Sequence, residues 1–423
     1  MTRYLRERTL FGPLIAEPPP TGLGLVVTLP AKNEGESLIR SLMSLRDCDT
    51  TAAPAEIIVV VNTSETDPPA IVSRNAADAA AAREWAAKNS TERRRFYLLE
   101  AHGLPRKHAG VGLARKIAMD EACRRLEAAG QPRGAIACFD ADSRCDPNYL
   151  AEVEALFRRD ESCQAGSVYF EHPLEGDEFS PAVYDAIAHY ELHLRVYVNA
   201  QKWAGFPFAT QTIGSSMAVR ADAYQAQNGM NKRQAGEDFY FLHKFTPLGR
   251  VVDLNTTRVI PSPRVSHRVP FGTGRAVADR LAAPEGEAPN THAPDSFRAL
   301  RTLFERVDDF RTAKDTDLPT LLAGSPEPVR VFLEKQDFAG RLEEIRANTT
   351  DAAAFRARFF RWFNAFLLMK FVHFARDGFF PDVPVVEAAR WLLETRGDNR
   401  DGNARELLER WRRIDRSGAE DSR

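Results

Sequence analysis

The sequence predicts an α/β fold: an α/β/α sandwich with a largely parallel sheet, followed by a mainly helical C-terminal region. Up to about residue 139, short continuous apolar runs of strand length alternate with longer segments whose apolar residues recur at helical spacing. After about residue 282 the strand-like runs give way to helical patterns rich in Arg, Phe and Glu. The regular strand-helix-strand order implies right-handed crossovers and parallel pairing, with helices on both faces of the sheet.

The elements of the first half follow from these patterns in order. The expected strands are 23–29, 56–61, 96–99 and 134–139, and the expected helices are 35–45, 70–88 and 113–128. Beyond residue 146 the pattern is looser. There we expect a helix from 147, a strand at 165–170, a long helix at 182–201, a strand at 213–219, a short helix from 236 and a strand at 250–253.

Composition changes divide the chain into three parts. Residues 1–21 are expected to form an N-terminal arm that ends in the stiff run Pro18-Pro19-Pro20. Residues 22–281 should form the α/β domain, and residues 295–423 the helical region. The Pro, Glu and Gly cluster at about 282–294 is the expected linker.

Bulk properties exclude several classes of protein. Fifty-seven Lys and Arg against 59 Asp and Glu give a net charge of −2, which argues against a dedicated nucleic-acid binder. Five scattered cysteines without a C-x-x-C pair indicate a reducing compartment. The charged N-terminus is not a secretory signal, and the longest apolar stretch, 359–374, is too charged to span a bilayer. We therefore expect a cytoplasmic protein, with peripheral contact to the inner face of a membrane as the minority alternative.

The strongest chemical signal is Asp140-Ala141-Asp142, directly after the fourth expected strand. In an extended segment, residues i and i+2 point to one side, so both carboxylates can face one ion. Such a pair suits Mn²⁺ or Mg²⁺, which would neutralise a leaving pyrophosphate. Ligands of open α/β sheets bind outside the carboxyl ends of strands, where this pair lies. Taken alone, the pair is more often an ordinary strand-to-loop turn.

Four further motifs follow strands in a fixed order. They are Pro30-Ala31-Lys32-Asn33-Glu34, Asn62-Thr63-Ser64, Gly112-Leu113-Ala114-Arg115 and Gly236-Glu237-Asp238. With the Asp-x-Asp pair, this ordered set resembles the inverting family 2 glycosyltransferases of the GT-A fold, a Rossmann-like sandwich. The resemblance covers about residues 23–274. It implies transfer of a sugar from a nucleoside-diphosphate sugar to an acceptor hydroxyl, with inversion.

The resemblance also implies roles for the nucleotide-binding residues. Pro30, Ala31 and Glu34 would line the nucleoside pocket, with Glu34 on the ribose or base. Asn62 stands where the family usually has an Asp that reads the base, so the base is left open between uracil, guanine and another. Arg115 would approach the nucleotide or diphosphate.

The metal and catalytic roles follow from the same resemblance. Asp140 and Asp142 match the metal motif, with Asp142 the direct ligand, and Asp238 matches the catalytic base beside Glu237. Inversion needs one carboxylate that takes the acceptor proton, and a helix start near the pocket is a suitable place for it. Without the other motifs, Glu237 and Asp238 would be interpreted as a charge pair that stabilises a helix N-terminus.

A late loop, 262–274, offers further candidates. His267 is a candidate third metal ligand, because neutral imidazole binds Mn²⁺. Alternatively, it is a surface histidine between Arg264 and Arg268, which would contact phosphates or belong to a mobile lid.

Two further motifs can be excluded as functional signatures, and two aromatic clusters are assigned to a cleft and to a buried helix. Gly110-Val111-Gly112 begins like a dinucleotide fingerprint but lacks the third glycine, which excludes a Rossmann dehydrogenase. His189 and His193 lack the Glu of a zinc protease motif. Aromatic residues at 203–208 are placed in an acceptor cleft, and the aromatic stripe at 359–374 predicts a buried helix. The remaining alternatives are a retaining GT-A transferase and a non-catalytic scaffold of the same fold. The sequence does not specify sugar or acceptor.

Overall fold

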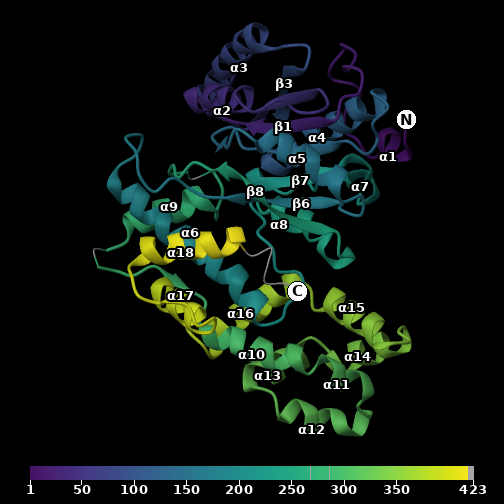
Figure 1. Cartoon of the computed structure of the whole chain (residues 1–423), viewed down its shortest axis with the longest axis vertical. Coiled ribbons are helices and arrows are strands. Elements are labelled where there is room, and N and C mark those ends of the chain that lie inside the picture. The colour runs from purple at the N-terminus through teal and green to yellow at the C-terminus, as the bar shows by residue number, and fades with distance from the viewer. Residues whose placement is uncertain (267, 285, 418–423) are drawn as a thin grey trace. The chain divides into compact units, whose positions relative to one another are not determined.

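A computed structural model describes residues 1–266, 268–284 and 286–417. It confirms the predicted fold class, a GT-A-like α/β/α sandwich with a mainly helical C-terminal region (Figure 1). The main sheet has the strand order β3-β2-β1-β4-β7-β6-β8-β5. Its strands are β1 Leu25–Ala31, β2 Ala55–Ser64, β3 Arg94–Leu104, β4 Ala135–Cys138, β5 Arg144–Cys145, β6 Ala165–Phe170, β7 Met217–Arg220 and β8 Val251–Ile260.

The sheet is parallel in its first half and mixed in its second. Strands β3, β2, β1 and β4 pair in parallel, as the strand-helix alternation predicts. Strand β7 runs antiparallel to both β4 and β6, and β5 runs antiparallel to β8. The prediction of a largely parallel sheet therefore holds for the first half, where a crossover helix connects each strand to the next, whereas in the second half β6 and β8 pair in parallel beside antiparallel neighbours.

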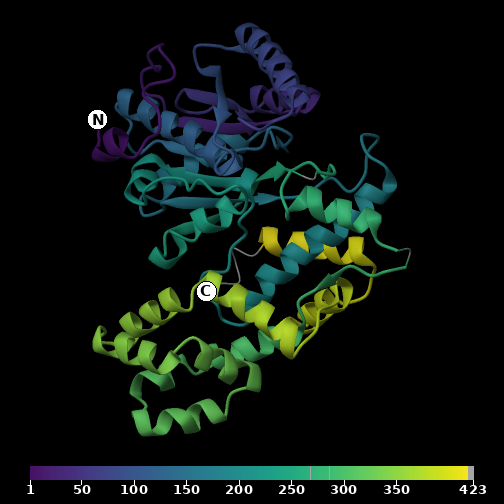
Figure 2. The ribbon, with the colours of Figure 1, turned by 180° about the vertical axis from the view of Figure 1, so that it is seen from behind.

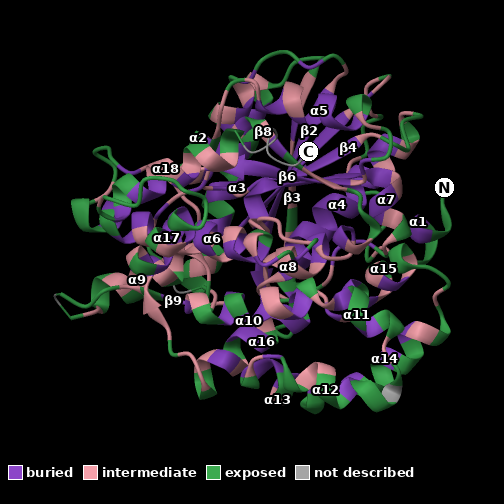
Figure 3. Cartoon of the chain, turned by 60° about the horizontal axis from the view of Figure 1, so that its bottom comes forward, coloured by how far each residue is buried: buried purple, intermediate pink, exposed green. Residues whose placement is uncertain are grey.

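Helices cover both faces of this sheet and bury alternate residues of the central strands. They are α1 Arg3–Glu7, α2 Glu36–Arg46, α3 Pro69–Asn89, α4 Val111–Ala128, α5 Tyr149–Arg159, α7 Ala221–Ala226 and α8 Glu237–Leu242. Val27 and Val59 join a core with α2, α3 and α5, whereas Val26 and Ile58 join one with α4, α7 and α8. Strand residues alternate in direction, so burial on both faces requires the continuous apolar runs seen in the sequence. Figure 3 shows these strands buried.

The N-terminal segment is anchored on α4. The Tyr4 hydroxyl donates to Asp120 at 2.7 Å, and the Glu121 carboxylate accepts the backbone N–H groups of Leu14 and Ile15, each at 3.1 Å. Buried carboxylates need such partners. The described residues of 1–179, 212–275 and 415–417 form one compact unit, to which this segment belongs.

The second compact unit contains the described residues of 180–211 and 276–414. Its long helix α6, Pro181–Trp203, packs against α17, Val385–Glu394, as Figures 1 and 2 both show. The remaining elements of the chain are α6 Pro181–Trp203, α9 Thr273–Ala282, β9 Asn290–Thr291, α10 Pro294–Glu305, α11 Val307–Thr312, α12 Leu318–Ala323, α13 Glu327–Lys335, α14 Phe338–Ala347, α15 Ala352–Trp362, α16 Ala365–Gly378, β10 Val383–Pro384, α17 Val385–Glu394 and α18 Ala404–Ser417, with short 3-10 turns at Gly214–Ser216, Thr246–Leu248 and Asp315–Asp317.

The aromatic residues at the end of α6 pack inside this second unit. Trp203 meets Trp391 edge to face at 5.0 Å between ring centroids, and Phe206 packs against Phe304 and Phe360. Phe206 is buried and Trp203 is half-buried, so their placement in an acceptor cleft is wrong. These rings pack against helices that begin near residue 294 and later, a pairing that local composition does not reveal.

The aromatic stripe at 359–374 forms two helices instead of one. Helix α15 ends at Trp362, and the Asn364 side chain caps α16 by accepting the N–H groups of Phe366 and Leu367 at 3.0 Å. Asn is a preferred N-cap residue, which explains the break within a continuous aromatic run. Phe359 of α15 and Phe371 of α16 are buried on either side of it. In the described part of the chain, every helix is too short or too polar to cross a membrane.

A histidine cluster lies within the second unit. The His193 Nδ1 atom is 2.7 Å from the Thr291 hydroxyl, its ring lies 6.0 Å from that of His292, and His292 is 3.3 Å from Asp382. Burial, reinforced by His292, lowers the pKa of His193 from 6.5 to about 4. The folded protein therefore keeps this imidazole neutral.

The stability of the protein is expected to fall as the pH drops from about 6.5 to about 4. In that window the unfolded chain protonates His193 and the folded chain does not, so acid favours unfolding. Replacing His193 with Gln should remove up to about 3 kcal/mol of this dependence at pH 4. Denaturant unfolding at pH 7, 5.5 and 4 measures it, with His189→Gln on the same helix as control. Equal pH dependence in wild type and His193→Gln would contradict the prediction.

Candidate active site

Loops at the carboxyl ends of three parallel strands carry most of the residues singled out in the sequence. Pro30 and Ala31 end β1, Asn62 lies near the end of β2, and Asp140 follows β4. Because β1 pairs in parallel with both β2 and β4, these ends meet at one edge of the sheet. Asp142 lies in a turn, so the extended geometry expected for Asp140-Ala141-Asp142 ends after Asp140.

The acidic side chains of the site form two clusters, and Arg115 holds the first of them together. Its guanidinium is buried and donates to Asp140 at 2.5 Å, to Glu237 at 3.0 Å and to the Gly214 carbonyl at 2.7 Å. Arginine presents its donors in a rigid fork, so one side chain can hold several acceptors in fixed positions. Arg115 therefore joins Asp140, after β4, to Glu237 at the start of α8.

Asp238 lies beside this group. A Cβ atom on Gly214 would lie 3.3 Å from an Asp238 carboxylate oxygen and 2.6 Å from the Arg115 guanidinium, so only glycine fits there. The other oxygen of Asp238 accepts the Phe239 N–H at 2.7 Å. Burial, together with the charge of Glu237, raises the pKa of Asp238 to about 7. A carboxylate with this pKa can exchange protons near neutral pH.

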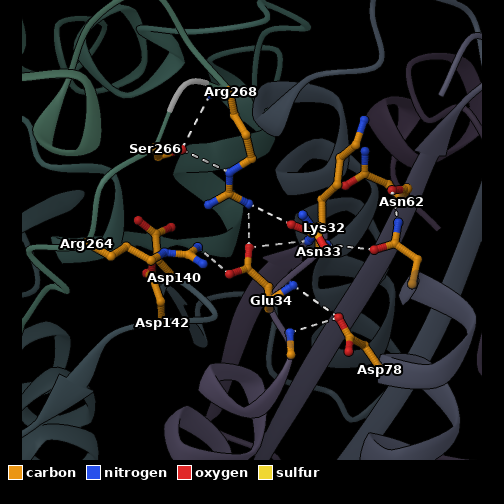
Figure 4. Close-up of polar contacts among 12 residues, drawn as sticks. Lys32, Asn33, Glu34, Asn62, Asp78, Asp140, Asp142, Arg264, Ser266 and Arg268 are labelled. Carbon is orange, nitrogen blue, oxygen red and sulfur yellow. Dashed lines mark hydrogen bonds and ion pairs between the residues drawn. The ribbon is translucent and has the colours of Figure 1, made fainter. Parts of the chain in front are cut away.

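Arg264 holds the second cluster of acidic side chains together. It pairs with Asp142 at 2.5 Å and with Glu34, and Arg268 donates to Glu34 at 2.6 Å (Figure 4). The Glu34 side chain is only 6% exposed, so two arginines compensate its buried charge. Burial raises the pKa of Asp142 to about 6, although Arg264 opposes the shift.

Two buried polar residues of α3, Asn75 and Asp78, contact the loop that carries Glu34. Sequence reasoning did not identify them as functional. Their signal was present, because they are polar residues three positions apart in an otherwise alanine-rich helix. That spacing places both on one helix face.

The glycines before Arg115 have a packing role. A Cβ atom on Gly110 would lie 2.5 Å from the backbone of Gln234, and one on Gly112 would lie 2.4 Å from the Arg233 carbonyl oxygen. The close approach of the 231–234 backbone requires glycine at both positions. This explains the Gly-x-Gly pattern without a dinucleotide.

The predicted metal ligands are Asp140, Asp142 and His267, of which the structure describes the two aspartates. His267 lies outside the described residues. Among the residues described, no set of three or more His, Cys, Asp or Glu side chains is arranged to hold an ion. Asp140 and Asp142 each have an arginine partner instead.

Comparisons with known proteins give distant structural similarities to solved structures. No protein-family model and no curated protein matches the chain. S. aureus TarS 1-349 resembles it with a TM-score of 0.39 and 14% identity, over 80% of this chain and 91% of that one. The same protein in complex with UDP-GlcNAc gives 0.39 and 12%, over 80% and 92%. S. aureus TarS gives 0.37 and 13%, over 76% and 55%. These similarities are too remote to assign a function.

Proposed function

We propose that this chain is a glycosyltransferase that moves a sugar from a nucleoside-diphosphate sugar to an acceptor hydroxyl, with inversion. One observation carries the proposal. Arg115 links a carboxylate at the end of β4 to the helix start that carries Asp238, whose pKa is raised to about 7. A general base and a diphosphate-binding edge are thereby held next to each other. The same ordered motifs support membership of the inverting family 2.

Asp238 is the proposed base. Attack of an acceptor hydroxyl on the anomeric carbon requires a group that accepts its proton, and a pKa near the working pH makes a carboxylate effective in this role. Glu237 is committed to Arg115, and its charge raises the proton affinity of Asp238. The two acidic residues therefore have separate roles, one as base and one as its electrostatic neighbour.

The donor would bind at the carboxyl ends of β1, β2 and β4. Pro30, Ala31, Glu34 and Asn62 would line the nucleoside side, and Asp140 would face the diphosphate. Arg115, saturated by carboxylates and buried, would act by holding Asp140. Arg264 and Arg268 are the nearest cationic groups to Glu34 and Asp142, and they are suited to an anionic ligand.

The carboxylates fit a hard divalent ion such as Mn²⁺ or Mg²⁺. Mg²⁺ is commonly held by one or two carboxylates together with substrate phosphates and water, so two protein ligands suffice. To bind the ion, Asp142 would have to release its partner Arg264, whose side chain is 23% exposed and can move into solvent. Arg115, the partner of Asp140, is only 2% exposed and would stay in place. When bound, the ion supplies neutralisation of charge on the leaving diphosphate.

Nucleotide binding tests the proposal directly. Thermal unfolding of the protein with UDP-, GDP-, ADP- and dTDP-sugars, each with and without Mn²⁺, should show stabilisation by one nucleotide class that increases with the ion. A ligand at a hundred times its Kd stabilises by about 2.7 kcal/mol, which such an assay detects. No stabilisation by any of these donors at millimolar concentration would favour a non-catalytic scaffold.

A further inference from the structure

The loop that carries Glu34 has an unusual backbone. Asn33 has a φ of 55° and Gly35 a φ of 61°, so two of three consecutive residues lie in the left-handed region. For Asn33 this conformation is unfavourable, although Asn tolerates it better than most residues. Such a loop needs external contacts that select its conformation.

Helix α3 supplies these contacts. The Asn75 side chain, fully buried, accepts the Asn33 N–H at 2.7 Å and donates to the Asn62 carbonyl at 2.9 Å. One oxygen of Asp78 accepts the N–H groups of Glu34 at 3.0 Å and of Gly35 at 2.9 Å (Figure 4). Three consecutive backbone N–H groups of the loop thus donate hydrogen bonds to two side chains on one face of α3.

From these contacts we propose that Asn75 and Asp78 are positioning residues for the donor site. They set the loop so that the Glu34 carboxylate faces Arg264, the residue that also holds Asp142. Asn75 in addition ties this loop to the end of β2 through Asn62. The inference rests on the proposed function, because it is this function that gives the loop a nucleotide to bind.

The expected consequence is a loss of donor affinity more than of rate. When a binding site is already ordered in the free protein, no binding free energy is lost in ordering it, so the affinity is higher. Without Asp78, the loop would sample other conformations, and the nucleotide would have to select the productive one. The reacting groups around Asp238 lie on other elements and should be unaffected once donor is bound, so the Michaelis constant for the donor should rise with little change in kcat.

The chain contains a matched control. Glu154 of α5 is also buried, and its carboxylate accepts two consecutive backbone N–H groups, those of Ala52 at 2.8 Å and Ala53 at 2.7 Å. That loop precedes β2 and so lies at the amino end of the strand. Glu154 and Asp78 therefore make the same kind of contact at opposite ends of the sheet.

The experiment compares Asp78→Ala, Asp78→Asn and Glu154→Ala with wild type. Calorimetry with UDP and GDP in the presence of Mn²⁺ measures nucleotide affinity, steady-state kinetics separates kcat from the donor Michaelis constant, and hydrogen exchange without nucleotide reports on segment 32–36. Asp78→Ala should weaken nucleotide binding about tenfold or more, which corresponds to the net contribution of about one hydrogen bond. Asp78→Asn, which keeps an acceptor oxygen, should restore part of it.

Glu154→Ala should lower the unfolding temperature like Asp78→Ala but leave nucleotide affinity unchanged. Equal affinity loss in both alanine variants, or none in Asp78→Ala, would overturn the inference. Unchanged hydrogen exchange in segment 32–36 of Asp78→Ala would also overturn it. If hydrogen exchange accelerates in Asp78→Ala but wild type binds neither nucleotide, Asp78 does order the loop, and the proposed function with UDP or GDP fails.

Discussion

Replacing Asp238 with Asn is expected to lower kcat by about 10²–10⁴-fold, the usual contribution of general base catalysis. Asn keeps the size and one acceptor oxygen of Asp238 but cannot take up the acceptor proton. Donor affinity should survive, because the nucleotide-binding groups lie on other elements. In wild type, kcat should rise with pH through about 7, since the pKa of Asp238 is raised to about 7 and only the ionised form acts as base.

Glu237→Gln is the control for this experiment. Glu237 receives a hydrogen bond from Arg115 and lies beside Asp238, so the substitution should alter the pH profile more than the maximal rate. If Glu237→Gln abolishes transfer and Asp238→Asn does not, the roles of the two residues are exchanged. If neither variant matters, an inverting mechanism fails. The anomeric configuration of the product, determined by NMR, then decides for a retaining transferase.

Replacing Asp142 with Ala should eliminate the part of donor binding that depends on Mn²⁺ while the fold remains intact. Asp142 lies in a turn, outside every helix and strand, and its side chain is 18% exposed, so its replacement disrupts no regular element. Calorimetry of the nucleotide with and without Mn²⁺ measures the effect. The same metal-dependent affinity in Asp142→Ala and wild type would disprove the assignment.

Arg264 provides the complementary variant. In the structure it occupies Asp142 and Glu34, so an ion on Asp142 competes with it. Arg264→Gln should therefore bind Mn²⁺ more tightly than wild type in the absence of nucleotide, as the fraction of free Mn²⁺ in an electron paramagnetic resonance titration would reveal. Weaker Mn²⁺ binding by Arg264→Gln would contradict the competition.

Local sequence patterns predicted the strands of the α/β domain well where a single apolar run corresponds to a single strand. The apolar run at 165–170 coincides with β6, and the run at 56–61 lies within β2. The expected strand at 213–219 begins too early. Its first residues form a 3-10 turn, in which the Ser216 N–H donates to the Ile213 carbonyl and the Gly214 carbonyl accepts from Arg115.

Periodicity and neighbouring residues were enough to predict the alternation of strands and helices, and to single out the acidic residues after β4 and at the start of α8. The tertiary structure decided which charges meet. Arg115 is 122 positions from Glu237, and Arg264 is 230 positions from Glu34. It also decided that α3 anchors the Glu34 loop and that α6 packs with the later helices. The physical reason is that a buried charge or donor requires a partner without specifying its place in the chain.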